Sequence, residues 1–535
     1  MILIGQQTSR VSQPFVHKAF EAHAERFPQR LALTCGENRL SYRELNERAN
    51  QFAHYLTKRG FGPGSTVGVC LDRSPEMVIS ILGVLKAGAA YVPLDTTYPA
   101  ERLRLMTSQL TGMKLIVASS ATRAMISEAD SEILDTAEVG AQLESFSQTN
   151  PVTEISESSI CYVVFTSGST GAPKAVAVRH EGWCNLLTWL VAEFHLNEDS
   201  NGLLLSPAGF DISQRALMTP LFAGSVLHLL PSRNFDVLMA YRLMRALRVR
   251  TLHCAPSALY LLLERDNAEG GNAFEALDLA FVGGEPIAAS RVAGWATRPG
   301  NLARLVNVYG VAECTDVATA HVLTDYADYL SGGVPIGCPI YNVSIYVIDH
   351  SLAPVEPGEI GEICISGIGI GAGYLNDSQL NSERFVTVRY ANDEVQLYRT
   401  GDLGRVRDDG KLMYVGRVDR QVKIRGMRVD LGDVEAALEA NECVRQAIVL
   451  PVAGEGTGET LLMACVLPSD EATGVPFDAR ALRRDLLEVL PKPMVPREIV
   501  PVTRFPLSPN GKVDRDALAL RVRESGRARP ADNSP

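Results

Sequence analysis

The stretch that most constrains the fold of this chain runs from Tyr162 to Arg179 and reads YVVFTSGSTGAPKAVAVR. A β-branched apolar run gives way to the small residues Thr166, Ser167, Gly168, Ser169, Thr170 and Gly171, and a second β-branched run follows Lys174. This pattern predicts a strand, a loop and a second strand. Glycines let a backbone approach a polyanion, hydroxyls add donors, and a lysine adds a compact charge. The loop therefore indicates a phosphate site, with a plain surface loop as the alternative.

Length and composition indicate a globular protein of more than one domain. With 535 residues, 46% of them hydrophobic and 21% charged, the chain can bury a large core. A net charge of −11 without a basic run gives no basis for binding nucleic acid or an anionic membrane. The most apolar stretch, residues 77–94, contains Lys86, glycines and Pro93, and is too broken to span a bilayer.

Targeting and cysteine signals are absent from the sequence. The N-terminus, MILIGQQTSR, lacks the basic start and long apolar core of a signal peptide. The ten cysteines show no spacing typical of a zinc site or a disulfide framework. A reducing cytoplasm is therefore the expected location.

The hydrophobic pattern predicts an α/β protein with two domains. Helical spacing over residues 15–27, 42–56 and 76–86 alternates with short apolar strands at 67–71 and 91–95, whereas residues 119–159 are polar and peripheral. From Val343 the pattern favours short strands between Pro-Gly and Asp-Gly turns. The charged run GRVDRQVKIRGMRVD, from Gly416, indicates an interdomain joint. We predict a large mixed α/β domain (1–418), a small α+β lid domain (419–522) and an unstructured tail (523–535).

Further segments, in order and over nearly the whole chain, resemble the amino-acid adenylation domains of nonribosomal peptide synthetases, a branch of the adenylate-forming superfamily. The loop order TSGSTG-x-PK is one of them, and the others are 40–45 (LSYREL), 85–95 (LKAGAAYVPLD), 210–213 (FDIS), 307–310 (NVYG) with Glu313, 361–365 (GEICI) to 373–375 (GYL), 398–403 (YRTGDL), 416–426 (GRVDRQVKIRG) and 510–515 (NGKVDR). The ordered set is far more specific than any one piece.

The resemblance implies an ATP-dependent ligase that forms AMP. Such an enzyme activates an α-amino acid with ATP and Mg²⁺ to aminoacyl-AMP and pyrophosphate. It then loads the acyl group as a thioester onto the phosphopantetheine of a carrier protein. No Leu-Gly-Gly-x-Ser-Leu-like run follows Lys512, so the enzyme is expected to stand alone and to use a carrier in trans, with a carrier segment that has been cut away as the alternative. A small accessory activator protein is a further partner that the resemblance allows.

The resemblance also assigns nucleotide and catalytic residues. The loop Thr166–Gly171 with Lys174 would hold the outgoing pyrophosphate, Glu313 would bind the magnesium ion, and Lys512 would bridge the substrate carboxylate and the α-phosphate. Fixed cations and donors lower the barrier where two anions meet. Asp419 is the expected hinge, because Lys512 has to leave before a thiol can approach. The remaining nucleotide residues would be Gly284, Glu285, Asn307, Val308, Tyr309 (stacked on adenine), Gly310, Asp402 (on the ribose hydroxyls) and Arg417.

A second group of residues would select the amino acid. Asp211 would pair with the α-ammonium group, and Lys512 would serve the carboxylate. The pocket would be lined by Asp211, Ile212, Arg215, His253, Phe281, Gly283, Val308, Asp316 and Val317. An apolar substrate favours an apolar pocket, so these polar groups indicate a polar side chain. His253, Phe281 and Gly283 resemble glutamate-type pockets, and this resemblance implies a Glu-like or Gln-like side chain. The alternative is that Arg215 and Asp316 neutralise each other and only shape an apolar slot.

Three other interpretations stay open. An acyl-CoA ligase of the same superfamily would accept free CoA and ignore the α-amino group. A degenerate, non-catalytic relative is suggested only by Ala175, where the family has glycine, and by Val311-Ala312, where it has Pro-Thr. An α/β enzyme of unrelated chemistry requires the motif order to be coincidence.

Overall fold

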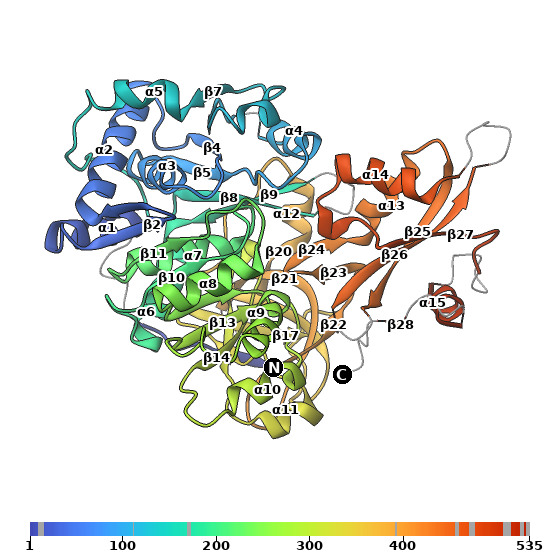
Figure 1. Ribbon diagram of the computed structural model, residues 1–535. Helices are drawn as coiled ribbons and strands as arrows, with labels where there is room; N and C mark the ends of the chain where they lie inside the picture. Colours follow the sequence, from blue (N-terminus) through green and yellow to red (C-terminus); the bar gives the residue numbers. More distant parts are fainter. Residues whose placement is uncertain are drawn as a thin grey trace.

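The computed structural model describes residues 1–8, 15–110, 112–167, 173–390, 393–454, 459–469, 477–506, 515–524 and 529–530. A large part, coloured from blue through yellow to light orange in Figure 1, contains three sheets with helices around them, and a smaller part in darker orange and red lies beside it. The predicted mixed α/β fold with a small C-terminal lid is confirmed.

The first sheet carries the Tyr162–Arg179 stretch. Its seven strands lie in the order β19 (Gly373–Tyr374), β9 (Lys174–Arg179), β8 (Ile160–Thr166), β5 (Ala90–Pro93), β4 (Thr66–Cys70), β6 (Leu115–Ala118) and β7 (Glu132–Asp135). The strands from β8 to β7 run parallel, while β8 and β9 form an antiparallel hairpin, as predicted. One face packs on α3 (Pro75–Lys86) and the other on α4 (Ala100–Ser108).

The second sheet has nine strands. Their order is β16 (Cys338–Pro339), β15 (Thr319–Val322), β14 (Arg304–Tyr309), β13 (Leu279–Gly283), β12 (Thr251–Cys254), β10 (Gly202–Leu204), β11 (Leu227–Leu229), β2 (Leu31–Cys35) and β3 (Asn38–Ser41). One face packs on α8 (Val237–Leu247), α9 (Pro256–Ala268) and α10 (Ala289–Ala296). The other face shares a core with the first sheet and with α1 (Val16–Arg26), α6 (His180–Phe194) and α7 (Asp211–Phe222).

The third sheet joins the chain's first residues to the stretch that begins at Val343. It contains β1 (Ile2–Ile4), β17 (Val343–Ile348), β18 (Gly361–Gly367), β21 (Asp393–Val406), β20 (Phe385–Tyr390) and β22 (Leu412–Arg417). The remaining helices of the large part are α2 (Tyr42–Lys58), α5 (Thr136–Leu143), α11 (Tyr326–Gly332) and α12 (Ser378–Arg384). Helix α2 begins with a capping box of Ser41 and Glu44 and buries its apolar stripe, which explains why this segment is helical.

The lid has a core of its own. A two-stranded hairpin, β23 (Gln421–Ile424) and β24 (Met427–Asp430), leads to α13 (Leu431–Glu439) and to a sheet of β27 (Glu498–Pro501), β26 (Thr460–Pro468), β25 (Val444–Ala453) and β28 (Arg529–Pro530). Helices α14 (Ala479–Val489) and α15 (Arg515–Glu524) complete it. The lid core packs on Tyr98 and Phe210 of the large part.

Three segments differ from the sequence-based expectation. The polar region 119–159 contributes β7 to the first sheet, and the proline-rich run after α14 contributes β27. Within the expected tail, α15 extends to Glu524 and Arg529–Pro530 pair with Val452 and Ala453. Short edge strands have few residues to show a pattern, which explains why they were missed.

A buried ion pair ties α1 to α3. Lys86 Nζ lies 2.6 Å from Glu21 Oε1, and the lysine side chain is 0% exposed. Burial lowers the pKa of Lys86 to about 8, although Glu21 favours its charged form. Lys18 contacts the other oxygen of Glu21 at 2.7 Å and is partly exposed.

We expect Lys86→Met to lower the free energy of unfolding by about 2 kcal/mol. Removing one partner of a buried pair costs roughly 3–5 kcal/mol, and Lys18 reduces that penalty because it still neutralises Glu21. Urea unfolding followed by tryptophan fluorescence measures the change. Lys18→Met is the matched control, with an expected loss below about 1 kcal/mol. Equal losses in the two variants would contradict this account.

Candidate active site

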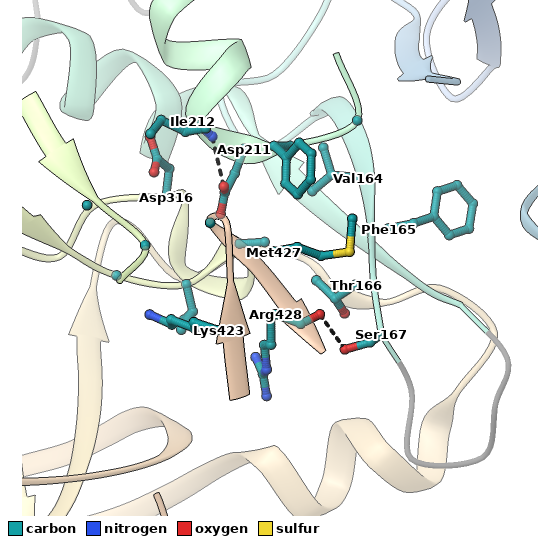
Figure 2. Close-up of a pocket in the computed structure, with 18 of the residues that line it drawn as sticks. Val164, Phe165, Thr166, Ser167, Asp211, Ile212, Asp316, Lys423, Met427 and Arg428 are labelled. Carbon is teal, nitrogen blue, oxygen red and sulfur yellow. Dashed lines mark hydrogen bonds between the residues drawn. The ribbon is translucent and has the colours of Figure 1, made fainter. Parts of the chain in front are cut away.

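A pocket opens where β8, β13 and β14 end and where α7 begins. Ligands of open α/β sheets bind outside the carboxyl ends of the strands, which is the position of this pocket. Lid residues close one side of it, so both parts of the chain contribute (Figure 2). The predicted residues that line it are Thr166, Ser167, Asp211, Ile212, Arg215, Gly283, Gly284, Val308, Gly310, Glu313, Asp316 and Val317.

The phosphate loop lies at one side of the pocket. Thr166 ends β8 and pairs in register with Lys174 of β9, which brings both to the mouth of the hairpin. Burial lowers the pKa of Lys174, while Asp377 opposes this effect. Gly168, Ser169, Thr170 and Gly171, between these strands, lie outside the described residues, and so does Lys512.

Asp211 is the first residue of α7 and points into the pocket (Figure 2). Its Oδ1 accepts a hydrogen bond from the Ile212 backbone N–H at 2.8 Å. Burial raises the pKa of Asp211, and Arg215 opposes that rise. A carboxylate at a helix N-terminus, beside a pocket and with few cationic partners, can receive a ligand's ammonium group.

Two buried charged side chains, Arg215 and Asp316, line the pocket. Arg215 Nε lies 2.7 Å from Asp316 Oδ2, and the two side chains are 1% and 9% exposed. Burial raises the pKa of Asp316 to about 7 although Arg215 favours its ionised form. Nη1 of Arg215 has no hydrogen-bond partner among the described residues. His253 stacks on Phe281 with ring centroids 4.7 Å apart, and neither ring lines the pocket.

The backbone around Asp316 is unusual. Thr315 and Asp316 have φ values of 61° and 67°, in the left-handed region that costs free energy for residues other than glycine. The turn packs on Gly310, where a Cβ would lie 2.1 Å from the Asp316 carbonyl oxygen. Only glycine allows this approach, so Gly310 fixes where Asp316 enters the pocket.

Tyr309 and Asp402, the residues expected to contact the adenosine, do not line this pocket. Asp402 is buried and accepts hydrogen bonds from Arg417 and from the Tyr309 hydroxyl, the latter at 2.7 Å. Lys423 Nζ of the lid lies 5.5 Å from the centre of the Tyr309 ring. Asn307 donates to the Pro335 carbonyl at 2.7 Å and does not line the pocket.

Glu313 is a buried carboxylate that, among the described residues, forms an ion pair with Arg428. Tyr374 donates its hydroxyl hydrogen to Glu313 Oε1 at 2.6 Å. The hydroxyl oxygens of Tyr374 and Tyr398 are 2.9 Å apart and share a hydrogen bond. Nη1 of Arg428 contacts both oxygens of Glu313 at 3.3 and 3.5 Å. Burial favours the neutral acid, but Arg428 and Tyr374 hold the pKa of Glu313 below its usual value.

This donor set fits a magnesium ion that is shared with phosphates. No group of three or more His, Cys, Asp or Glu side chains converges on a metal position among the residues described. One buried carboxylate with hard oxygen donors suits Mg²⁺, which takes its other ligands from phosphates and water. Among the described residues, Glu313 is the one that could hold this ion.

The lid hairpin is the part of the site that the sequence analysis missed. Its turn, Arg425-Gly426, has two positive φ values of 50° and 79°, as a tight two-residue hairpin requires. The Gly426 N–H donates to Glu285 Oε1 at 2.7 Å, and the Ser167 hydroxyl donates to the Arg428 carbonyl at 2.7 Å. The two short strand-like runs on either side of Arg425 and Gly426 indicate a hairpin in the sequence, but they do not indicate that this hairpin lies in the pocket.

Family models match both parts of the chain. The model described as AMP-binding enzyme matches residues 20–375, and that of the AMP-binding enzyme C-terminal domain matches residues 433–512. The chain belongs to the AMP-binding enzyme family. The sequence-based identification as an adenylate-forming enzyme is thereby confirmed.

Relatives of this AMP-binding enzyme include peptide synthetases. A linear gramicidin synthase of Brevibacillus parabrevis is 37% identical over 97% of this chain and 6% of that protein. A dimodular nonribosomal peptide synthase of Bacillus subtilis is 36% identical over 96% of this chain and 22% of that protein. The chain thus spans only a small share of these relatives. A solved NRPS protein containing adenylation and PCP domains, bound to a vinylsulfonamide inhibitor, has a TM-score of 0.83 at 27% identity, covering 95% of this chain and 84% of that one.

A further feature belongs to the AMP-binding enzyme as a whole. No helix in the described ranges is long and apolar enough to cross a membrane.

Asp419, the expected hinge residue, lies between β22 and β23 and accepts a hydrogen bond from Arg417 Nε at 2.6 Å. Arg417 also contacts Asp402, so one arginine links Asp419 to Asp402. The hinge role of Asp419 stays a prediction.

Proposed function

We propose that this AMP-binding enzyme activates an α-amino acid with ATP and Mg²⁺ to give an aminoacyl-adenylate and pyrophosphate. The observation that carries this proposal is Asp211, a partly buried carboxylate at the start of α7 in the same pocket as Thr166, Ser167 and Glu313. A carboxylate there provides a counter-ion for an α-ammonium group. Amino-acid-dependent exchange of pyrophosphate into ATP, measured across the common amino acids, tests the proposal.

The nucleotide roles follow from the same arrangement. Thr166, Ser167 and the loop up to Lys174 would hold the phosphates, and Glu313 would hold the magnesium ion, which spreads the charge of the transferred group. Asp402, supported by Arg417, would accept hydrogen bonds from the ribose, and Tyr309 would stack on adenine after Lys423 has moved away. Lys512 would then join the acyl carboxylate and the α-phosphate. The remaining nucleotide contacts would come from Gly284, Glu285, Asn307, Val308 and Gly310.

The substrate side chain is proposed to be acidic or amidic, of the Glu or Gln type. The support is Arg215, which is buried and keeps Nη1 without a partner among the described residues, although Asp316 contacts Nε. The alternative of full mutual neutralisation requires both charges to be present at the working pH. With a pKa of about 7, Asp316 is partly neutral near pH 7, which leaves Arg215 available to a carboxylate.

We expect Arg215→Leu to lose the best polar substrate selectively. Hydrogen bonds to charged groups contribute about 1.5–3 kcal/mol, so kcat/KM for that substrate should fall roughly tenfold to a hundredfold. The exchange panel on the variant measures this loss. Activity confined to Leu, Ile, Val or Phe in the parent enzyme, and unchanged in Arg215→Leu, would contradict an acidic or amidic side chain.

A pH dependence follows for an acidic substrate. As the pH rises through about 7, Asp316 ionises and competes for Arg215. We therefore expect KM for the acidic amino acid to rise over this range, whereas Asp316→Asn should keep KM low and nearly constant. KM measured by exchange from about pH 6 to 8.5 tests this expectation. A parallel rise in both enzymes would assign the titration to another group.

The second half-reaction is proposed to be transfer of the acyl group to the phosphopantetheine thiol of a carrier protein, with a small accessory activator as a further partner. The peptide-synthetase relatives support this assignment. An acyl-CoA ligase is the competing function, and it would transfer to free CoA and show no need for the α-amino group. Transfer assays with holo-carrier and with CoA separate the two. A reducing cytoplasm is the proposed location, because the structure holds its ten cysteines as thiols.

A further inference from the structure

Arg428 contacts Glu313 through its side chain and Ser167 through its backbone. The guanidinium contacts both carboxylate oxygens, and the carbonyl accepts the Ser167 hydroxyl at 2.7 Å (Figure 2). Gln421 holds the Nε side of the guanidinium. One lid residue therefore engages the proposed metal ligand and a proposed phosphate ligand together.

Glu313 needs a cation in every arrangement of the lid. Its side chain is 1% exposed, and a buried carboxylate without a positive partner is strongly destabilising. Tyr374 supplies a hydrogen bond to Glu313 but no charge. Other charged side chains of the described residues also act on Arg428, namely Lys174, Asp402, Arg417, Asp419 and Lys423. Of the described residues, Arg428 is the cation in an ion pair with Glu313.

We propose that Arg428 and the magnesium ion of the nucleotide compete for Glu313, so that hairpin docking and metal–nucleotide binding exclude each other. The inference rests on the proposed role of Glu313 as the metal ligand. Arg428 is then a positioning residue, which fills the cation site after magnesium pyrophosphate has left. Tyr374 holds the carboxylate in one orientation for either cation.

The competition predicts that a variant without the charge of Arg428 binds magnesium ATP more tightly than the parent enzyme does. In Arg428→Gln, ATP with magnesium chloride should bind about tenfold more tightly by calorimetry, a coupling within the usual range between two ligands. ATP with EDTA should bind the parent and the variant equally. Arg425→Gln is the matched control, since Arg425 lies in the same hairpin, is half exposed and pairs with Glu459. We expect it to bind as the parent does.

The position of the hairpin gives a second readout, which does not depend on any variant at residue 428. Cys338 is exposed and the other cysteines are buried, so one dye can be placed there and another on Glu488→Cys of α14. Magnesium ATP should change energy transfer in the otherwise unaltered enzyme, whereas ATP with EDTA should not.

In a Glu313→Gln background, Arg428→Gln should bring no further gain in affinity.

Three results would overturn the inference: equal or weaker binding of magnesium ATP by Arg428→Gln, the same gain in EDTA, or energy transfer that ignores magnesium. Each of these can occur in an enzyme that still exchanges pyrophosphate, so the proposed function would survive it. A parent enzyme that binds no magnesium ATP would instead remove both the proposed function and this inference.

Discussion

Replacing Asp211 with asparagine is expected to lower kcat/KM for the preferred α-amino acid at least about a hundredfold. The change leaves the substrate's ammonium group in a largely dry pocket without a counter-ion, and losing one member of a buried charge pair costs about 2–5 kcal/mol. The carboxylate already carries a raised pKa because of burial, so it gains from a cationic ligand. Pyrophosphate exchange with the amino acid and with its des-amino analogue measures the effect.

The ratio between these two compounds is the informative quantity. The des-amino analogue should lose little in Asp211→Asn, since it brings no charge to this position. Asp316→Asn serves as the control, because it removes the other pocket carboxylate and should leave the ratio unchanged. A parent enzyme that prefers the des-amino acid would favour the CoA-ligase interpretation.

Lys512→Ala should reduce adenylate formation by about a hundredfold or more while largely sparing thiol transfer. Removing one preorganised cation from a site where two anions meet costs on the order of a hundredfold in rate. In the lid arrangement described above, the hairpin residues Lys423 and Arg428 face the pocket. We expect thiol transfer to take place in this arrangement, so the loss of Lys512 should largely spare it. Exchange measures the first step, and loading of a carrier from preformed adenylate measures the second.

Lys492→Ala provides the comparison for Lys512→Ala. Lys492 is an exposed lysine of the same lid, and its loss should leave both half-reactions intact. Near-normal exchange in Lys512→Ala would remove that lysine from the mechanism. An equal loss of both steps would instead indicate that it supports the folding of the lid.

The sequence predicted those parts of the site that depend on local patterns. The β8–β9 hairpin follows from two β-branched runs around small residues, and the pocket positions of Asp211, Glu313 and Asp316 follow from motif spacing. The sequence allowed two interpretations of Arg215 and Asp316, a polar substrate site or a pair that neutralise each other. Only the geometry shows that the two side chains form an ion contact.

Contacts between distant segments were beyond reach of the sequence. The charged run from Gly416 predicts a joint between domains, but the docking of the hairpin on Ser167, Glu285 and Glu313 depends on how two separately packed units meet. Asn307 and His253 were expected to face a ligand, but they do not line the pocket. Which residues of a strand reach the pocket depends on neighbouring side chains from other strands.

The division of labour between the two parts has an evolutionary consequence. The pocket side chains Arg215 and Asp316 belong to the large part, whereas the lid has its own core and contributes the hairpin. Under the proposed function, mutations on α7 or in the Thr315–Val317 turn would therefore redirect substrate choice without any change in the lid. A lineage of such enzymes can diversify its building blocks by drift at a few positions. Under the same proposal, the lid would be common to every substrate.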